Sequence, residues 1–183
     1  SYPRYLRLSC WMAEMENASC GNNSVLLDGW LRLSMLEFRV LSVLDVPVML
    51  PLEQDAHAYP WSDSVLSASF GERYQNVGAW WQGQLVGFYV ADALLDESTL
   101  HNLCVAPEYQ GRGWGRALLA HYLQQTALAG CRCWWLEVRR SNIRAQQLYL
   151  QQGYQQVGIR KGYYRAATGS EDALVMHRGE RLD

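Results

Sequence analysis

Three alternating glycines lie in the segment Gln110-Gly111-Arg112-Gly113-Trp114-Gly115, between an apolar, strand-like run and a helix-like run. This segment constrains the fold more than any other part of the chain. Glycine lets the backbone come close to a ligand, and a helix N-terminus offers N–H donors and partial positive charge to phosphates. Arg112 and Arg116 add charge. The segment predicts a phosphate-binding turn; the alternative is a tight strand-to-helix connection that binds nothing.

The spacing excludes two common nucleotide-binding motifs. A dinucleotide fingerprint would need glycine where Arg116 stands, with an acidic residue suitably placed further along the chain, and neither condition is met. A phosphate-binding loop of the Walker type would need Gly-Lys-Ser/Thr, which does not follow.

The composition limits the classes of protein to consider. The chain has 183 residues, of which 49% are hydrophobic and 19% charged, which suits one globular domain with an appendage. The net charge of −2 provides no general basic field for nucleic acid, and no apolar run reaches the roughly 18 residues of a membrane span. The five cysteines form no CxxC pair and the histidines lack metal-ligand spacing. We therefore expect a cytoplasmic protein without a metal, a membrane span or direct nucleic-acid binding.

The pattern along the chain changes near Met35. Residues 1–34 show no sustained periodicity, and we interpret them as an N-terminal extension of uncertain origin. Residues 35–183 are predicted to form one α+β domain, with a mixed, mostly antiparallel central sheet and helices on both faces. The predicted strands are 36–41, 77–81, 85–94, 99–105, 133–138, 154–159 and 172–177, and the predicted helices are 45–57, 62–70, 114–129 and 142–152.

A second group of polar residues follows the strand at 133–138. Glu137 lies at the carboxyl end of that strand, Asn142 opens the next helix, and Tyr149 is two turns further along on the same face. The three side chains could converge on one point; alternatively, they are a surface glutamate, a helix cap and a core tyrosine. A carboxylate can accept the proton of an ammonium nucleophile, and a phenol can give one to a thiolate leaving group.

Residues 103–119 closely resemble motif A of the GNAT acetyltransferase superfamily, with its pattern Q/R-x-x-G-x-G/A. The resemblance implies a GNAT fold with a splayed strand pair, and acetyl-CoA as co-substrate with its pyrophosphate on the backbone amides of the turn. A bulky Trp114 departs from the smaller residue usual there, which is expected to alter packing over the pyrophosphate. The implied cofactor contacts are Leu103, Cys104, Val105, Gly111, Arg112, Gly113, Trp114, Gly115, Arg116 and Asn142.

Further segments extend the resemblance over residues 35–177 to the bacterial ribosomal-protein-alanine N-acetyltransferases. The matching segments are 58–62, 71–74, 95–100, 135–139, 141–142, 148–149, 153–154, 160–164 and 171–173. Their likeness implies transfer to the N-terminal alanine of the eighteenth small-subunit ribosomal protein, bound through its N-terminal peptide. It also implies Glu137 as proton acceptor and Tyr149 as proton donor. Two alternatives stay open: acetylation of a lysine or small-molecule amine, and an acyl-CoA-sensing module without turnover.

An acceptor peptide with basic residues would need an acidic mouth with aromatic walls. The candidates for charge are Asp96, Glu97, Glu171 and Asp172, and those for walls are Tyr59, Trp61, Tyr163 and Tyr164.

Overall fold

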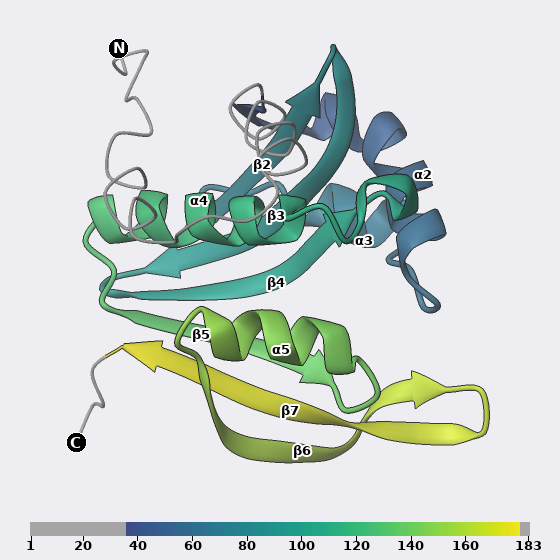
Figure 1. The fold of residues 1–183 in the computed structure, drawn as a ribbon, viewed down its shortest axis with the longest axis vertical. Coiled ribbons are helices and arrows are strands. Elements are labelled where there is room, and N and C mark those ends of the chain that lie inside the picture. Colours follow the sequence, from purple (N-terminus) through teal and green to yellow (C-terminus); the bar gives the residue numbers. More distant parts are fainter. Residues whose placement is uncertain (1–35, 180–183) are drawn as a thin grey trace, which may run out of the picture. The chain divides into compact units, whose positions relative to one another are not determined.

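The computed structural model describes residues 36–179 (Figure 1). The predicted extension over residues 1–34 lies outside this range. The described part forms a seven-stranded sheet in the order β1-β2-β3-β4-β5-β7-β6, in which only the β4–β5 pair is parallel. The predicted fold class, a mostly antiparallel α+β sheet with helices on both faces, is confirmed.

The first half of the sheet is built from consecutive antiparallel strands. A 3-10 turn η1 and two helices, α2 and α3, lie between β1 and β2 in the chain, and Ser42 and Asp45 form a capping box at η1. The elements are β1 (Glu37–Val40), η1 (Val43–Asp45), α2 (Val46–Ala56), α3 (Asp63–Ala68), β2 (Tyr74–Trp81), β3 (Gln84–Leu94) and β4 (Glu97–Val105).

The second half begins with the glycine turn and ends in a long hairpin. Its β5 pairs with β7 along its whole length, and β7 pairs with β6 at the sheet edge. The elements are η2 (Pro107–Tyr109), α4 (Trp114–Leu128), β5 (Cys133–Arg139), α5 (Ile143–Gln151), β6 (Gln155–Ala166) and β7 (Gly169–Gly179).

The two halves meet at β4 and β5, and their pairing stops early. The parallel register runs from Glu97↔Cys133 to Leu100↔Leu136. On its other side, β4 stays paired with β3 as far as Val105↔Gly87. The two strands therefore diverge toward their carboxyl ends, as Figure 1 shows, which is the splayed pair that the resemblance to GNAT acetyltransferases implied.

Alternating side chains of β3 divide the core between the two faces of the sheet, as the twofold period of a strand requires. Phe88 and Val90 are buried in the same cluster as Met49 of α2 and Leu66 of α3. Tyr89, between them in sequence, faces α4, where its ring contacts that of Tyr122. Helices α2 and α3 therefore cover one face of this half, and α4 covers the other.

The β6–β7 hairpin is longer than predicted. A polar loop was expected over residues 161–171, but β6 continues to Ala166 and β7 begins at Gly169. Most of β6 is exposed, so its sequence carries no alternation of apolar and polar residues to reveal a strand. Irregular register between Arg160 and Tyr164 disturbs the pattern further. Within the described residues, no helix is long and apolar enough to cross a membrane.

Gly87 allows β3, β4 and α4 to approach one another closely. A Cβ at this position would lie 2.7 Å from the carbonyl oxygen of Cys104 and 2.9 Å from a methyl of Leu118. Because the carbonyl belongs to a paired strand, we expect Gly87→Ala to lower the free energy of unfolding by about 1–3 kcal/mol in urea denaturation. Gly71→Ala is the control, since its Cβ would meet nothing closer than 3.6 Å. Equal stability of the two variants would contradict the close approach.

Candidate active site

A cleft of about 1200 Å³ is lined by residues from both halves of the splayed sheet. Its walls come from the cleft-facing residues of β4, the glycine turn, the end of β5, one side of α5, the segment before α3, and β6. The splay of β4 from β5 therefore brings together the two groups of residues that the sequence singled out separately.

The glycine turn presents backbone to this cleft. Gly111 and Gly113 have φ angles of 78° and 87°, which favour glycine, and Gly113 is the N-cap of α4. No side chain caps this helix, and no acidic residue lies in its first turn. The amides of the first turn are thus available to an anion. Gly115 and Arg116 also line the cleft, whereas Arg112 lies over the ring of Tyr109, 5.9 Å from its centroid.

Gln110 fixes the turn between the end of β4 and α5. Its side-chain amide donates to the carbonyl oxygen of Val105 at 2.9 Å, and its oxygen accepts a hydrogen bond from Arg144 at 3.0 Å. Gln110 was not among the predicted contacts, although its place in the motif was a signal for it. Its role here is to position the turn.

Besides Arg112, two further predicted contacts place their side chains elsewhere. Leu103 and Val105 line the cleft, but the side chain of Cys104 between them points to the opposite face of the sheet, where its thiol donates to the carbonyl of Leu52 at 3.4 Å. The buried ring of Trp114 stacks on that of Tyr109 at 4.8 Å and also contacts Trp81. Neither side chain lines the cleft, so a contact with a ligand there would have to come from the backbone.

Glu137, Asn142 and Tyr149 all line the cleft. Arg160 donates to a carboxylate oxygen of Glu137 at 2.6 Å, and its guanidinium lies over the ring of Tyr163. Asn142 caps α5 by accepting a hydrogen bond from the Ala145 amide at 3.1 Å, so the helix-cap interpretation holds for this residue.

Tyr149 is almost wholly buried at the wall of the cleft, with 8% of its surface exposed. Burial raises the pKa of Tyr149 well above its usual value, and the neighbouring Tyr164 raises it further. Its hydroxyl is therefore protonated at neutral pH and available as a donor.

The predicted acidic mouth differs from expectation. Glu171 accepts hydrogen bonds from Arg139 and the Ser141 amide, and Asp172 accepts them from Arg140 and the Gly162 amide. These bonds, first those from Ser141 and then those from Arg139, lower the pKa of Glu171. Asp96 and Glu97 belong to the paired end of β4 and β5 and do not line the cleft.

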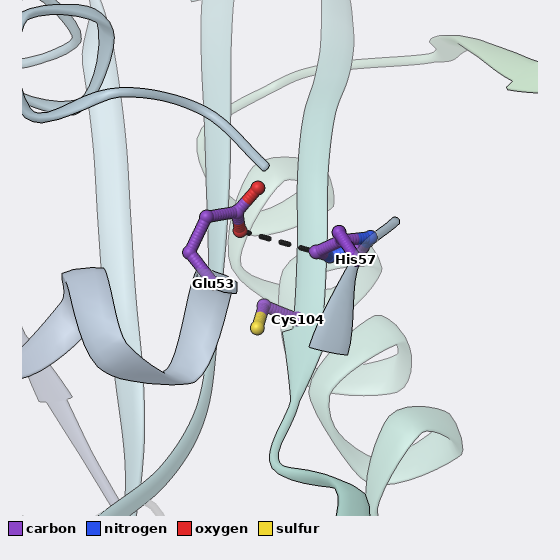
Figure 2. Close-up of side chains that lie close together, drawn as sticks. All are labelled: Glu53, His57 and Cys104. Carbon is purple, nitrogen blue, oxygen red and sulfur yellow. Dashed lines mark ion pairs between the residues drawn. The ribbon is translucent and has the colours of Figure 1, made fainter. Parts of the chain in front are cut away.

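The buried carboxylate of Glu53 was not predicted. Only 1% of Glu53 is exposed, and its two oxygens accept hydrogen bonds from the Trp61 amide and the Asn102 side chain, both at 3.0 Å. His57 lies 3.6 Å away, and the Cys104 thiol is close by (Figure 2). The available signal was spacing, since Glu53 shares one face of α2 with the buried Val46 and Met49.

The same cluster brings potential metal-ligating atoms of Glu53, His57 and Cys104 within 4.8 Å of one another. Burial raises the pKa of the Cys104 thiol, and the adjacent Glu53 raises it further, so this thiol keeps its proton at neutral pH. Both carboxylate oxygens already accept hydrogen bonds. We interpret the cluster as a hydrogen-bonded anchor for the segment between α2 and α3.

A splayed parallel strand pair beside an uncapped, glycine-rich helix N-terminus is the arrangement implied by the resemblance to acetyltransferases. Residues 44–154 match the model of the acetyltransferase (GNAT) family. The chain belongs to this family, whose members use acetyl-CoA.

Two characterised relatives support the assignment. The chain is 41% identical to the [ribosomal protein bS18]-alanine N-acetyltransferase of Escherichia coli K12 over 136 residues, which cover 74% of this chain and 92% of the relative. It is 40% identical to the enzyme of that name from Haemophilus influenzae over 137 residues, 74% of this chain and 93% of the relative. The crystal structure of the ribosomal-protein-S18-alanine N-acetyltransferase from Escherichia coli superimposes with a TM-score of 0.76 at 38% identity, covering 81% and 96% of the two chains.

Replacement of Glu53 tests its role as a buried anchor. Glu53→Ala leaves the Trp61 amide and the Asn102 side chain without their acceptor, so we expect a loss of about 2 kcal/mol in the free energy of unfolding. Asp55→Ala, at an exposed position of the same helix, should change it by less than about 0.5 kcal/mol. Urea denaturation at neutral pH measures the free energy of unfolding of both variants. A Glu53→Ala variant as stable as the Asp55→Ala control would refute the anchoring role of Glu53.

Proposed function

We propose that this chain transfers the acetyl group of acetyl-CoA to the N-terminal α-amino group of a protein, with the N-terminal alanine of ribosomal protein bS18 as acceptor. The observation that carries the reaction is a single cleft lined by the glycine turn, a carboxylate at Glu137 and a protonated phenol at Tyr149. The assignment of the acceptor rests on the names of relatives that this chain matches over most of their length.

The cleft fits the cofactor along the backbone. The uncapped first turn of α4 and the amides of residues 111–116 would hold the pyrophosphate, with Arg116 beside them. Past Leu100, β4 has no strand partner on the β5 side among the described residues, so its edge can pair with the amide groups of the pantetheine arm. Leu103 and Val105 then contact that arm with their side chains, and Cys104 contributes backbone alone.

Glu137 and Tyr149 supply the proton transfers. An α-amino group has a pKa near 8, so it is mostly protonated at neutral pH and must lose a proton before it can attack. Glu137 accepts that proton, the nitrogen attacks the thioester carbonyl carbon, and the carbon–sulfur bond breaks. Tyr149 then protonates the departing thiolate. The second proton lost by the new amide nitrogen returns to Tyr149 through solvent.

Arg160 donates a hydrogen bond to one oxygen of Glu137. An incoming ammonium group competes with this guanidinium for the carboxylate. Because the Arg160 side chain is about half exposed, it can turn outward at little cost.

The acceptor is tested with a peptide that begins with alanine and carries a lysine further along, with its N-terminus either free or blocked. We expect stoichiometric release of CoA and a mass increase of one acetyl group on the free peptide alone. Equal acetylation of the blocked peptide would show a lysine acetyltransferase. Binding of acetyl-CoA without a product from any peptide or small amine would show a module without turnover.

The acid–base roles are tested with Glu137→Gln and Tyr149→Phe. Each should lower kcat by roughly 10²–10⁴-fold, because each removes one proton transfer, while the Kd for acetyl-CoA changes little. The matched controls are Glu108→Gln, an exposed acid outside the cleft, and Tyr154→Phe, a buried tyrosine that does not line it. Steady-state kinetics that place the catalytic variants within a few-fold of their controls would exclude the assigned roles.

A further inference from the structure

The side chain of Arg139 lies between two aromatic rings from different halves of the protein. Its guanidinium carbon is 4.3 Å from the ring centroid of Tyr59 and 4.4 Å from that of Tyr164. Tyr59 belongs to the segment between α2 and α3, in the first half of the sheet, whereas Tyr164 belongs to β6 in the second. The Tyr59–Arg139–Tyr164 stack therefore joins the two halves where β4 and β5 no longer pair.

Further bonds hold Arg139 in this position. Its guanidinium forms an ion pair with Glu171 at 3.3 Å and donates to the carbonyl of Arg165 at 2.9 Å. The side chain is 22% exposed, and partial removal from water strengthens contacts between a cation and an aromatic ring. The arginine is thus held by β6 and β7 and also contacts the ring of Tyr59.

Tyr59 and Tyr164 are themselves anchored. The carboxylate of Glu53 accepts a hydrogen bond from the backbone amide of Trp61, two residues after Tyr59, and ties that segment to Asn102 of β4. Figure 2 shows this carboxylate beside His57 and Cys104. On the other side, the Tyr164 hydroxyl donates to the carbonyl of Glu137 at 3.3 Å. The stack is therefore hydrogen-bonded to the backbone of Glu137, the residue to whose carboxylate we assign the acceptor amine.

We infer that Arg139 is a positioning residue for the acceptor peptide. It holds the rings of Tyr59 and Tyr164 together as one wall of the cleft, along which the peptide behind the reacting N-terminus lies. All three residues line the cleft, and none belongs to the glycine turn or β4. Arg139 therefore governs the KM for a peptide acceptor and not the binding of acetyl-CoA. This inference rests on the proposed function.

The chain provides a matched control in the next residue. Arg140 also forms an ion pair, with Asp172 at 3.0 Å, but it contacts no ring and does not line the cleft. Arg139→Gln should raise the KM for an alanine-initiated peptide by roughly tenfold, the equivalent of one desolvated cation–ring contact. The kcat and the Kd for acetyl-CoA should stay within about threefold, and Arg140→Gln should change none of these values by more than that.

A truncated acceptor separates positioning from general damage to the fold. Alaninamide presents the same amine but has no peptide chain to lie along the Tyr59–Arg139–Tyr164 stack. Arg139→Gln should therefore leave its kcat/KM within about threefold of wild type, while that for the peptide falls about tenfold.

Tyr59 provides an independent variant at an exposed position, where the fold tolerates change. Tyr59→Leu should raise the peptide KM as Arg139→Gln does, and Tyr59→Phe, which keeps the ring, should retain wild-type values. The Tyr59→Leu and Arg139→Gln double variant should be little worse than either single one, because both remove the same contact.

Any of three results would overturn the inference: equal effects of Arg139→Gln and Arg140→Gln on the peptide KM, equal losses on peptide and alaninamide, or additive effects of the Tyr59 and Arg139 substitutions. A wild-type protein that acetylates no peptide N-terminus would instead refute the proposed function. The wild-type assay therefore distinguishes the two failures.

Discussion

The end of pairing between β4 and β5 after Leu100 and Leu136 is the constraint on which the rest of the site depends. Each strand stays fully paired with its outer neighbour: β4 with β3 as far as Val105, and β5 with β7 along its whole length. The separation therefore costs hydrogen bonds only along the inner ladder. Unpaired backbone groups in a sheet need partners. Here they lie along the cleft in which we propose that acetyl-CoA, which has amide groups of its own, is bound.

The splay also separates two kinds of recognition. On the β4 side, glycines at 111, 113 and 115 expose amides, and the uncapped helix adds its dipole, so backbone does most of the binding. On the β5–β6 side, Glu137, Arg139 and Tyr164 act through their side chains, each fixed by a long-range partner. The proposed function therefore assigns the cofactor to main-chain geometry and the acceptor to a set of side-chain contacts.

This division explains how much could be predicted from the sequence. The helix expected over 114–129 is observed as Trp114–Leu128, and that expected over 142–152 as Ile143–Gln151, because apolar periodicity and capping residues are local signals. The glycine turn could be predicted for the same reason, because its signal is also local in the sequence. A resemblance in motif A could not tell which side chains face the cleft. Cys104 points away from it because alternate residues of β4 face opposite sides of the sheet.

The acceptor side was harder to predict because its contacts join distant parts of the chain. Glu171 and Asp172 read as free acids in the sequence, yet both are bound by arginines that precede them by some thirty residues. They therefore position Arg139 and Arg140 and are not unpaired charges for a basic acceptor.

Tyr59 contacts Arg139 because the segment after α2 is held against β4 by Glu53. We propose that in this arrangement the carboxylate of Glu137 attracts the ammonium group, while the aromatic rings contact the chain behind it. On that proposal, selectivity for a peptide N-terminus follows from rings held by an arginine more than from an excess of negative charge.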